Sequence, residues 1–134
     1  MRIKTIQIKN FKCIAPNEVI LDFSENIIVL IGENNVGKSA ILSALNYFLS
    51  GIKTLPTEYF YNKQNDQDHA VVITITFCEL SDSDKSHQAV SPYISTEDQE
   101  ELWILKKVYY YSEDGKGKCD YTAIVNNEEK KNPA

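Results

Sequence analysis

Apolar and polar residues alternate at the start of the chain, where Ile6 and Ile8 are separated by Gln7 and followed by Lys9. A period of two places the apolar side chains on one face of an extended segment. The pattern therefore predicts a half-buried strand. After an intervening loop, residues 19–23 alternate in the same way and predict a second strand of this kind.

The next apolar segment differs, because Ile27–Ile31 is apolar at every position. Such a run is typical of a central strand covered on both faces. Apolar residues then recur at helical spacing from Ala40 to Leu49, and Gly51 stands where a helix is expected to end. We predict a helix over residues 38–50, followed by a polar loop over residues 52–69.

Further along the chain, Ala70–Leu80 is rich in β-branched residues and predicts another strand. Ser81–Asp84 has the residues of a helix N-cap, so it predicts either a short helix or a turn. Thr96 and Gln99 form a weak capping box, which predicts one or two further helical turns.

An aromatic-rich alternating segment, Leu102–Tyr111, is separated by a glycine-containing turn at residues 114–117 from a second strand over residues 119–125. This arrangement predicts a β-hairpin. Residues 126–134 have no apolar anchor, and we expect this polar tail to fray.

The composition is that of an ordinary globular protein, with 43% hydrophobic and 25% charged residues among 134. The net charge of −5 argues against a wholly basic nucleic-acid-binding surface but allows a local basic patch. No apolar run is long enough to span a membrane, and the N-terminus lacks the pattern of a signal peptide. Cys13, Cys78 and Cys119 are odd in number and far apart, which favours reduced thiols in a cytoplasmic protein.

The strongest motif is Gly-x-x-x-x-Gly-Lys-Ser, the Walker A phosphate-binding loop. It consists of Gly32, Glu33, Asn34, Asn35, Val36, Gly37, Lys38 and Ser39. Its glycines allow backbone N–H groups to surround a phosphate, and the helix that follows adds its own N–H groups. Lys38 is expected to reach the β- and γ-phosphates, and Ser39 to coordinate Mg²⁺. The motif lies between an apolar strand and an amphipathic helix, as it requires.

The motif predicts binding of a nucleoside triphosphate with Mg²⁺, but hydrolysis needs a further carboxylate at the end of a second buried strand. Glu79 ends a strand whose alternation indicates half exposure, so a solvated position is the preferred interpretation. We predict no catalytic residue within this sequence.

A second cluster combines aromatic and basic residues in the predicted hairpin. It contains Trp103, Lys106, Lys107, Tyr109, Tyr110 and Tyr111. Such residues can stack on nucleic-acid bases. Packing within the sheet is the preferred interpretation, because alternate side chains of a strand face the core.

Two stretches, Ile6–Lys12 and Ile28–Ser39, resemble the start of the RecF/SMC-like ABC ATPases. They look most like the OLD family of ATP-dependent nucleases, some of which act in bacterial anti-phage defence. Residues 70–84 are similar to the β-lobe strand that follows in that family. The resemblance covers most of residues 1–85 and is diffuse beyond them.

The resemblance implies an α/β P-loop NTPase fold, as the N-terminal lobe of an ABC ATPase head with an antiparallel β-lobe. We expect this incomplete domain over residues 1–125, with the β-lobe at 70–125 and a tail or linker to a missing remainder at 126–134. Family heads pair around ATP, which implies a homodimer. The implied ATP contacts are residues 32–39 together with Ala40, Asn10 and Lys12.

The sequence lacks the family's signature motif, Walker B acids and Toprim acids, so we expect no complete ATPase or nuclease site. Three interpretations stay open. The chain is the ATP-binding lobe of an ATPase that cleaves DNA, a nucleotide-dependent clamp of the SMC/RecF type on DNA or a partner, or a truncated lobe without activity. A preference for ATP over GTP rests on the resemblance.

Overall fold

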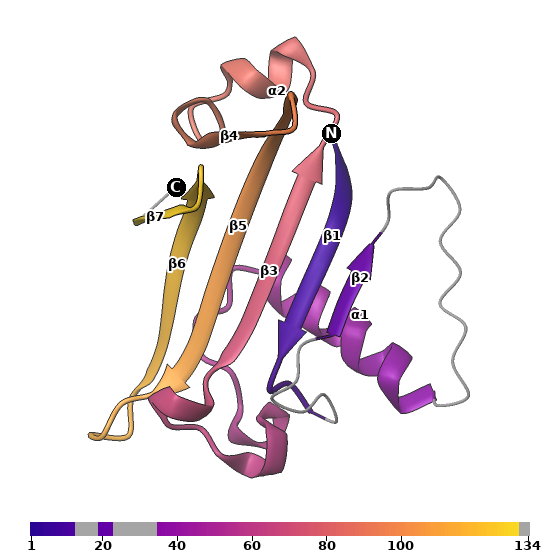
Figure 1. Cartoon of the computed structure of the whole chain (residues 1–134). Coiled ribbons are helices and arrows are strands. Elements are labelled where there is room, and N and C mark those ends of the chain that lie inside the picture. The colour runs from indigo at the N-terminus through magenta and orange to yellow at the C-terminus, as the bar shows by residue number, and fades with distance from the viewer. Residues whose placement is uncertain (13–18, 23–34, 132–134) are drawn as a thin grey trace.

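The computed structural model describes the backbone of residues 1–12, 19–22 and 35–131, and the side chains of residues 1–12 and 40–130. Its main feature is a seven-stranded antiparallel sheet in the order β2-β1-β3-β5-β6-β7, with β4 paired to β5 (Figure 1). The strands are β1 (Arg2–Lys9), β2 (Val19–Asp22), β3 (Val71–Cys78), β4 (Ile94–Glu97), β5 (Glu100–Tyr111), β6 (Gly117–Val125) and β7 (Glu128–Lys131). The α-helices are α1 (Asn35–Leu49) and α2 (Asp82–Ser86).

Strand β5 is the longest strand and organises the sheet around it. One of its edges pairs with β3, from Val71↔Tyr109 to Phe77↔Trp103. The other edge is shared, because β4 pairs with the start of β5 and β6 pairs with the rest. The turn after β6 links these two neighbours, since the Asn126 amide N–H donates to Ser95 Oγ at 3.0 Å.

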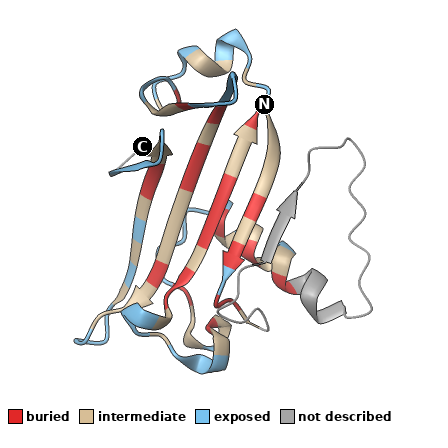
Figure 2. Ribbon diagram, viewed as in Figure 1, coloured by how far each residue is buried: buried red, intermediate tan, exposed pale blue. Residues whose placement is uncertain are grey.

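One face of the sheet carries the main core, and α1 lies against this face (Figures 1 and 2). The period of two in each strand brings apolar side chains to this face, and they meet the buried side of α1. The strand residues in this cluster are Ile6, Ile8, Val71, Ile73, Ile75, Leu105, Tyr109 and Ala123. The helix contributes Ala40, Ala44 and Phe48. Small residues on the helix allow it to approach the sheet closely.

The opposite face is more polar and, among the described side chains, holds a small apolar cluster of Cys78, Leu102 and Ile104, with Ile124 packed against it. Lys106 lies on this face and pairs with Glu129 of β7 at 2.6 Å. The two faces of the sheet are thus chemically distinct, as the alternation along its strands requires.

Several predicted elements are confirmed. The strands at the N-terminus and over residues 70–80 form, and Ile6 and Ile8 are buried as their spacing indicates. The aromatic segment forms the predicted hairpin, with Gly115 at a φ of +81° in its turn. Ser81 caps α2, where its hydroxyl accepts from the Asp84 amide at 3.1 Å and the Asp84 carboxylate accepts from the Ser81 amide.

The helix predicted from Thr96 and Gln99 is wrong. Thr96 lies in β4, where it pairs with Glu101 of β5. Asp98 and Gln99 both have positive φ and form the tight turn between these strands. The capping pattern is short and local, whereas pairing along β5 satisfies the backbone of the whole segment, so the sheet prevails over the local signal.

The prediction that the polar tail frays is wrong for its described part. Residues Glu128–Lys131 form β7, which pairs with Thr122–Val125 of β6. Asn126 and Asn127 have φ of 50° and 69°, as a two-residue type I′ turn requires. The tail is ordered without an apolar anchor because its backbone forms hydrogen bonds with the edge of β6. Such pairing does not require apolar side chains.

Two other boundaries differ from expectation. Helix α1 begins at Asn35, three residues before the predicted start, so its first turn lies inside the Walker A motif. The predicted loop over residues 52–69 contains three short 3-10 helices, at Thr57–Tyr59, Tyr61–Lys63 and Gln67–His69. The strand predicted over Ile27–Ile31 lies outside the described residues.

Candidate nucleotide-binding site

The end of the phosphate-binding motif forms the N-terminus of α1. Residues 35–39 of the motif have helical backbone, whereas Gly32, Glu33 and Asn34 lie outside the described residues. The side chains of Asn35, Val36, Lys38 and Ser39 also lie outside them, so their expected contacts with phosphate and Mg²⁺ stay predictions. The first N–H groups of a helix have no partner within it and are available to an anion. The described backbone therefore places the end of the motif at the N-terminus of a helix, and phosphate binding there stays a prediction.

The position of α1 is set by its packing on the sheet. Ala40 and Ala44 are fully buried and Phe48 is 4% exposed, one helical turn apart along the side that faces the core. Ala40, which the resemblance places among the nucleotide contacts, is thus a core residue in its side chain. Leu42 and Leu49 on the outer side are more than half exposed.

The segment after β1 reaches α1 through a turn that is fixed on both sides. Asn10 and Lys12 have φ of 63° and 52°, in the left-handed region. Phe11 between them is fully buried, and its ring stacks on Tyr59 with 6.0 Å between centroids. The Lys12 amide donates to the Tyr59 carbonyl at 2.7 Å, and the Tyr61 amide donates to the Asn10 carbonyl at 2.9 Å.

The side chain of Lys12 extends from this turn to α1. Its Nζ lies 3.2 Å from Ser43 Oγ and 4.4 Å from the centroid of the Tyr59 ring. Ser43 is four residues, or about one helical turn, after the last residue of the Walker A motif. The structure therefore brings the ammonium group of Lys12 close to the helix that carries the motif. A contact with nucleotide stays a prediction.

Asn10 has a structural role in the same turn. Its side chain is 5% exposed, and Nδ2 donates to the Ala70 carbonyl at 3.0 Å. A buried amide with its own partner joins the end of β1 to the start of β3. Its expected place beside the nucleotide also stays a prediction.

Sequence reasoning missed a set of contacts at the other end of α1, where its last carbonyl groups lie near β5. Lys107 Nζ donates to the Phe48 carbonyl at 2.6 Å, and its ammonium group lies 4.9 Å from the Phe48 ring centroid. Two residues on, the Tyr109 hydroxyl is 3.5 Å from the Tyr47 carbonyl. The period of two in β5 could have placed Lys107 on the core face, but no local signal names its helical partner.

These contacts satisfy carbonyl groups that a helix end leaves without partners. Helix α1 has no basic residue in its own last turn, so Lys107 supplies a cation from another element. A cation at this end is favoured by the helix dipole. Burial, with a smaller opposing effect from Cys119, lowers the pKa of Lys107 from its ordinary value. The ammonium group is thus partly desolvated, and the Phe48 carbonyl and the rings of Phe48 and Tyr121 compensate for the lost contacts with water.

The aromatic and basic residues of the hairpin pack largely within the protein. Tyr109 is fully buried, and the Tyr111 hydroxyl donates to the Leu55 carbonyl at 2.9 Å. The Trp103 ring packs against the Phe77 ring in a tilted arrangement, with 5.2 Å between centroids. These contacts favour sheet packing over base stacking for the core-facing members of the cluster.

Among the described residues, no group of three or more His, Cys, Asp or Glu side chains is placed to hold a metal ion. Glu79 at the end of β3 pairs with Arg2 Nε at 3.0 Å. No helix in this part of the chain is long and apolar enough to cross a membrane.

A family model described as an AAA ATPase domain matches residues 1–133. The chain belongs to this AAA ATPase domain family. The fold and the match together identify a nucleotide-binding domain of P-loop NTPase type, consistent with ATP as its nucleotide.

A solved structure from a study of ATP-driven dimerization and DNA-stimulated activation of SMC ATPases has a similar fold. The TM-score is 0.58 at 17% sequence identity, over 97% of this chain and 72% of the other. At this identity the likeness concerns the fold alone. No curated protein matches the sequence.

Proposed function

We propose that this AAA ATPase domain is the ATP-binding lobe of an OLD-like ATPase coupled to DNA cleavage or DNA processing. The observation that carries the proposal is a Walker A motif that ends in the first turn of α1, a helix packed on an antiparallel sheet. Mg²⁺ would bridge the phosphates and take Ser39 as a ligand. The Walker B, signature and nuclease residues would lie outside this sequence.

The docking of Lys12 supports the same proposal. Its Nζ is held by Ser43 on α1 and by the Tyr59 ring, so a positive charge lies beside the phosphate-loop helix. Small movements of this charge on nucleotide binding would be passed to the turn at Asn10–Lys12. The sequence of this turn resembles that of the OLD-like ATPases, which supports the proposal of an OLD-like ATPase in particular.

A nucleotide-dependent clamp of the SMC/RecF type is the second candidate. The fold similarity to an SMC ATPase structure favours it, because the study of that protein describes ATP-driven dimerization and activation by DNA. In this case two heads would close around ATP, and DNA would be bound without being cut.

One experiment separates the candidates. The protein is purified from its source with the chains that accompany it, and is incubated with plasmid DNA, Mg²⁺ and either ATP or no nucleotide. ATP-dependent cleavage supports the OLD-like proposal. ATP-dependent retention of DNA without cleavage supports the clamp. Absence of ATP binding contradicts both.

A further inference from the structure

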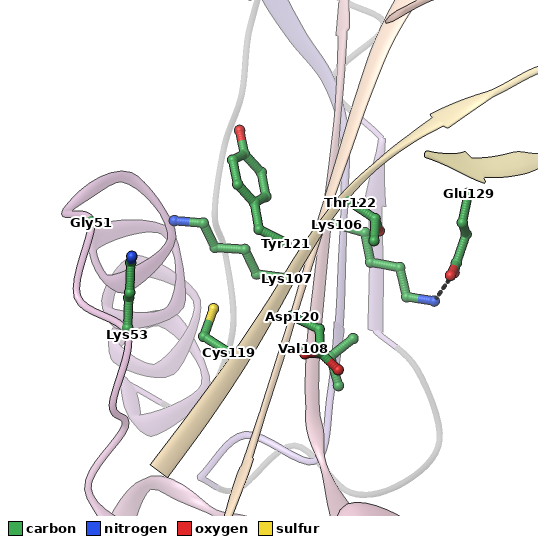
Figure 3. Close-up of a pocket in the computed structure, with 10 residues that line it drawn as sticks. All are labelled: Gly51, Lys53, Lys106, Lys107, Val108, Cys119, Asp120, Tyr121, Thr122 and Glu129. Carbon is green, nitrogen blue, oxygen red and sulfur yellow. Dashed lines mark hydrogen bonds and ion pairs between the residues drawn. The ribbon is translucent and has the colours of Figure 1, made fainter. Parts of the chain in front are cut away.

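A hollow of about 630 Å³ lies beside β6, at the C-terminal end of α1 (Figure 3). We call it the β6 hollow. It reaches both faces of the sheet. Gly51, Lys53, Lys107, Cys119 and Tyr121 line its core-facing side, and the other lining side chains, among them Asp120, lie on the opposite side of β6. The phosphate-binding motif is at the other end of α1, which at 15 residues is about 20 Å long. The β6 hollow is therefore separate from the candidate nucleotide site.

Two lysines of the hollow converge on the same space. Figure 3 shows Lys53 and Lys107 extending to one side of β6, next to Cys119. The positive charge of Lys53 contributes to lowering the pKa of Lys107, after the larger effect of burial. The two ammonium groups thus lie close enough to repel each other.

The described residues supply no acidic partner for these two lysines. Among the ion pairs of the described residues, none involves Lys53 or Lys107. Asp120 is exposed and points to the other side of β6 in Figure 3. Glu129 is already paired with Lys106 at 2.6 Å. The core-facing side of the hollow therefore carries two positive charges without a counter-charge from this part of the chain.

Contacts hold the side chain of Lys107 and the loop backbone around Lys53. Lys107 is held by the Phe48 carbonyl, and its ammonium group lies 5.2 Å from the Tyr121 ring centroid. The loop that carries Lys53 lies tightly on β6, because a Cβ on Gly117 would come within 2.5 Å of Thr54 Cγ2. The Tyr111 hydroxyl fixes the same loop through the Leu55 carbonyl. The backbone that carries Lys53 and Lys107 is therefore held in place before a ligand binds.

We propose that the β6 hollow binds a phosphate monoester as its dianion, between the ammonium groups of Lys53 and Lys107. A monoester carries a charge of about −1.5 to −2 at neutral pH, which matches two cations better than a carboxylate does. Lysine binds phosphate as a point charge, without a fixed fork geometry. An organic part of the monoester would lie beside Tyr121, whose side chain is on the same side of β6 as both lysines.

The test uses the full chain carrying Lys38→Ala, so that the Walker A loop does not compete for phosphate. Ribose 5-phosphate is titrated while backbone amide resonances are followed by NMR. We expect shifts at Gly51, Cys119 and Tyr121. Lys53→Glu should weaken binding by about tenfold or more, because it turns one attractive charge into a repulsive one. Lys53→Arg should restore it.

Lys118→Glu is the matched control, because Lys118 is an exposed residue of the same strand that does not line the hollow. It makes the same charge change and should leave the affinity within about twofold. Equal weakening by Lys53→Glu and Lys118→Glu would show nonspecific attraction and overturn the proposal. Binding of inorganic phosphate but not of ribose 5-phosphate would also overturn it, as would equal affinity for the monoanion dimethyl phosphate. Because Lys38 is absent from the test protein, none of these results bears on ATP binding.

Discussion

Among single side chains, Lys38 is the one whose removal should change nucleotide binding most. Its expected contacts with the β- and γ-phosphates are charge-assisted, each worth about 1.5–3 kcal/mol. We expect Lys38→Ala to weaken ATP binding by roughly 100-fold or more, which calorimetry measures directly. The fold should persist, because α1 is held by Ala40, Ala44 and Phe48.

Lys118→Ala is a control for this change, since Lys118 is exposed on β6 and far from the N-terminus of α1 in the sequence. It should bind ATP as the parent does. Undiminished affinity of the Lys38→Ala variant would show that the Walker A motif is not the ATP site.

Tyr109 should make the protein sensitive to alkaline pH. Burial is the main cause that raises the pKa of its phenol well above 10.0. The unfolded chain releases this proton near pH 10, whereas the folded chain retains it, so the stability that Tyr109 provides is present below pH 10 and declines as the pH rises above it. Burial also raises the pKa of Tyr121 and of the Cys119 thiol, with the same sign, whereas the lowered pKa of Lys107 acts in the opposite direction.

The comparison of parent and Tyr109→Phe isolates the phenol, because the other groups are common to both. Urea unfolding between pH 8 and pH 11 should show a decline that is shallower in the variant. The difference should approach about 1.4 kcal/mol per pH unit above pH 10. Parallel profiles for the two proteins would show that the Tyr109 phenol titrates normally.

At the level of elements, the main question is what holds α1 to the sheet. Lys107 joins β5 to the Phe48 carbonyl, and we expect Lys107→Met to lower the free energy of unfolding by about 2–3 kcal/mol, since a charged hydrogen bond and contacts with two rings are lost. Hydrogen exchange should accelerate at the C-terminal end of α1.

Lys106→Met is the matched variant, because Lys106 is the adjacent residue on the opposite face of β5 and pairs with Glu129 near the surface. Such a pair contributes at most about 1 kcal/mol. Equal losses in the two variants would indicate that the contact with α1 adds nothing to ordinary strand packing.

The turn between β6 and β7 offers a second test at this scale. Both central residues, Asn126 and Asn127, have positive φ, where glycine is less strained than asparagine. Asn127→Gly should raise the free energy of unfolding by about 0.5 kcal/mol. Asn126→Gly should lower it by about 1 kcal/mol, because the Asn126 Oδ1 accepts from the Thr96 amide at 3.2 Å.

Urea unfolding of both variants measures this contrast. A higher free energy of unfolding in both variants would mean that the hydrogen bond from Asn126 to β4 does not contribute to stability. A lower free energy of unfolding in both variants would mean that the side chain of Asn127 also contributes to stability.

For the whole molecule, the proposed function predicts association controlled by ATP. Light scattering should show a mass near 15.3 kDa without nucleotide and about twice that with a nonhydrolysable ATP analogue if the heads close as a homodimer. Lys38→Ala should remain monomeric under both conditions. A mass that does not respond to nucleotide in the parent would contradict head pairing through ATP.

The exposed side of α1 is consistent with an assembly larger than the described residues. Leu42 and Leu49 are 58% and 62% exposed, whereas Ala40, Ala44 and Phe48 on the other side are buried. The helix thus has apolar residues on both sides, although only one side meets the sheet. Amphipathic helices at a protein surface usually place polar residues there.

The sequence by itself determined the phosphate-binding motif, the strands with clear alternation and the hairpin around Gly115. These signals are local, since the motif needs its residues within one loop and a half-buried strand needs only a period of two. The Ser81 cap is local for the same reason. Each of these predictions concerns residues a few positions apart.

Only the tertiary structure decided the pairing of the polar tail as β7, the strand at Thr96 and the contacts of Lys12 and Lys107 with α1. These features depend on residues far apart in the chain: Lys107 and Phe48 are 59 positions apart, and Lys12 and Ser43 are 31 apart. An available strand edge gives a polar segment hydrogen bonds that its own sequence cannot reveal. A lysine likewise acquires its role from the carbonyl or hydroxyl group that the fold brings to it.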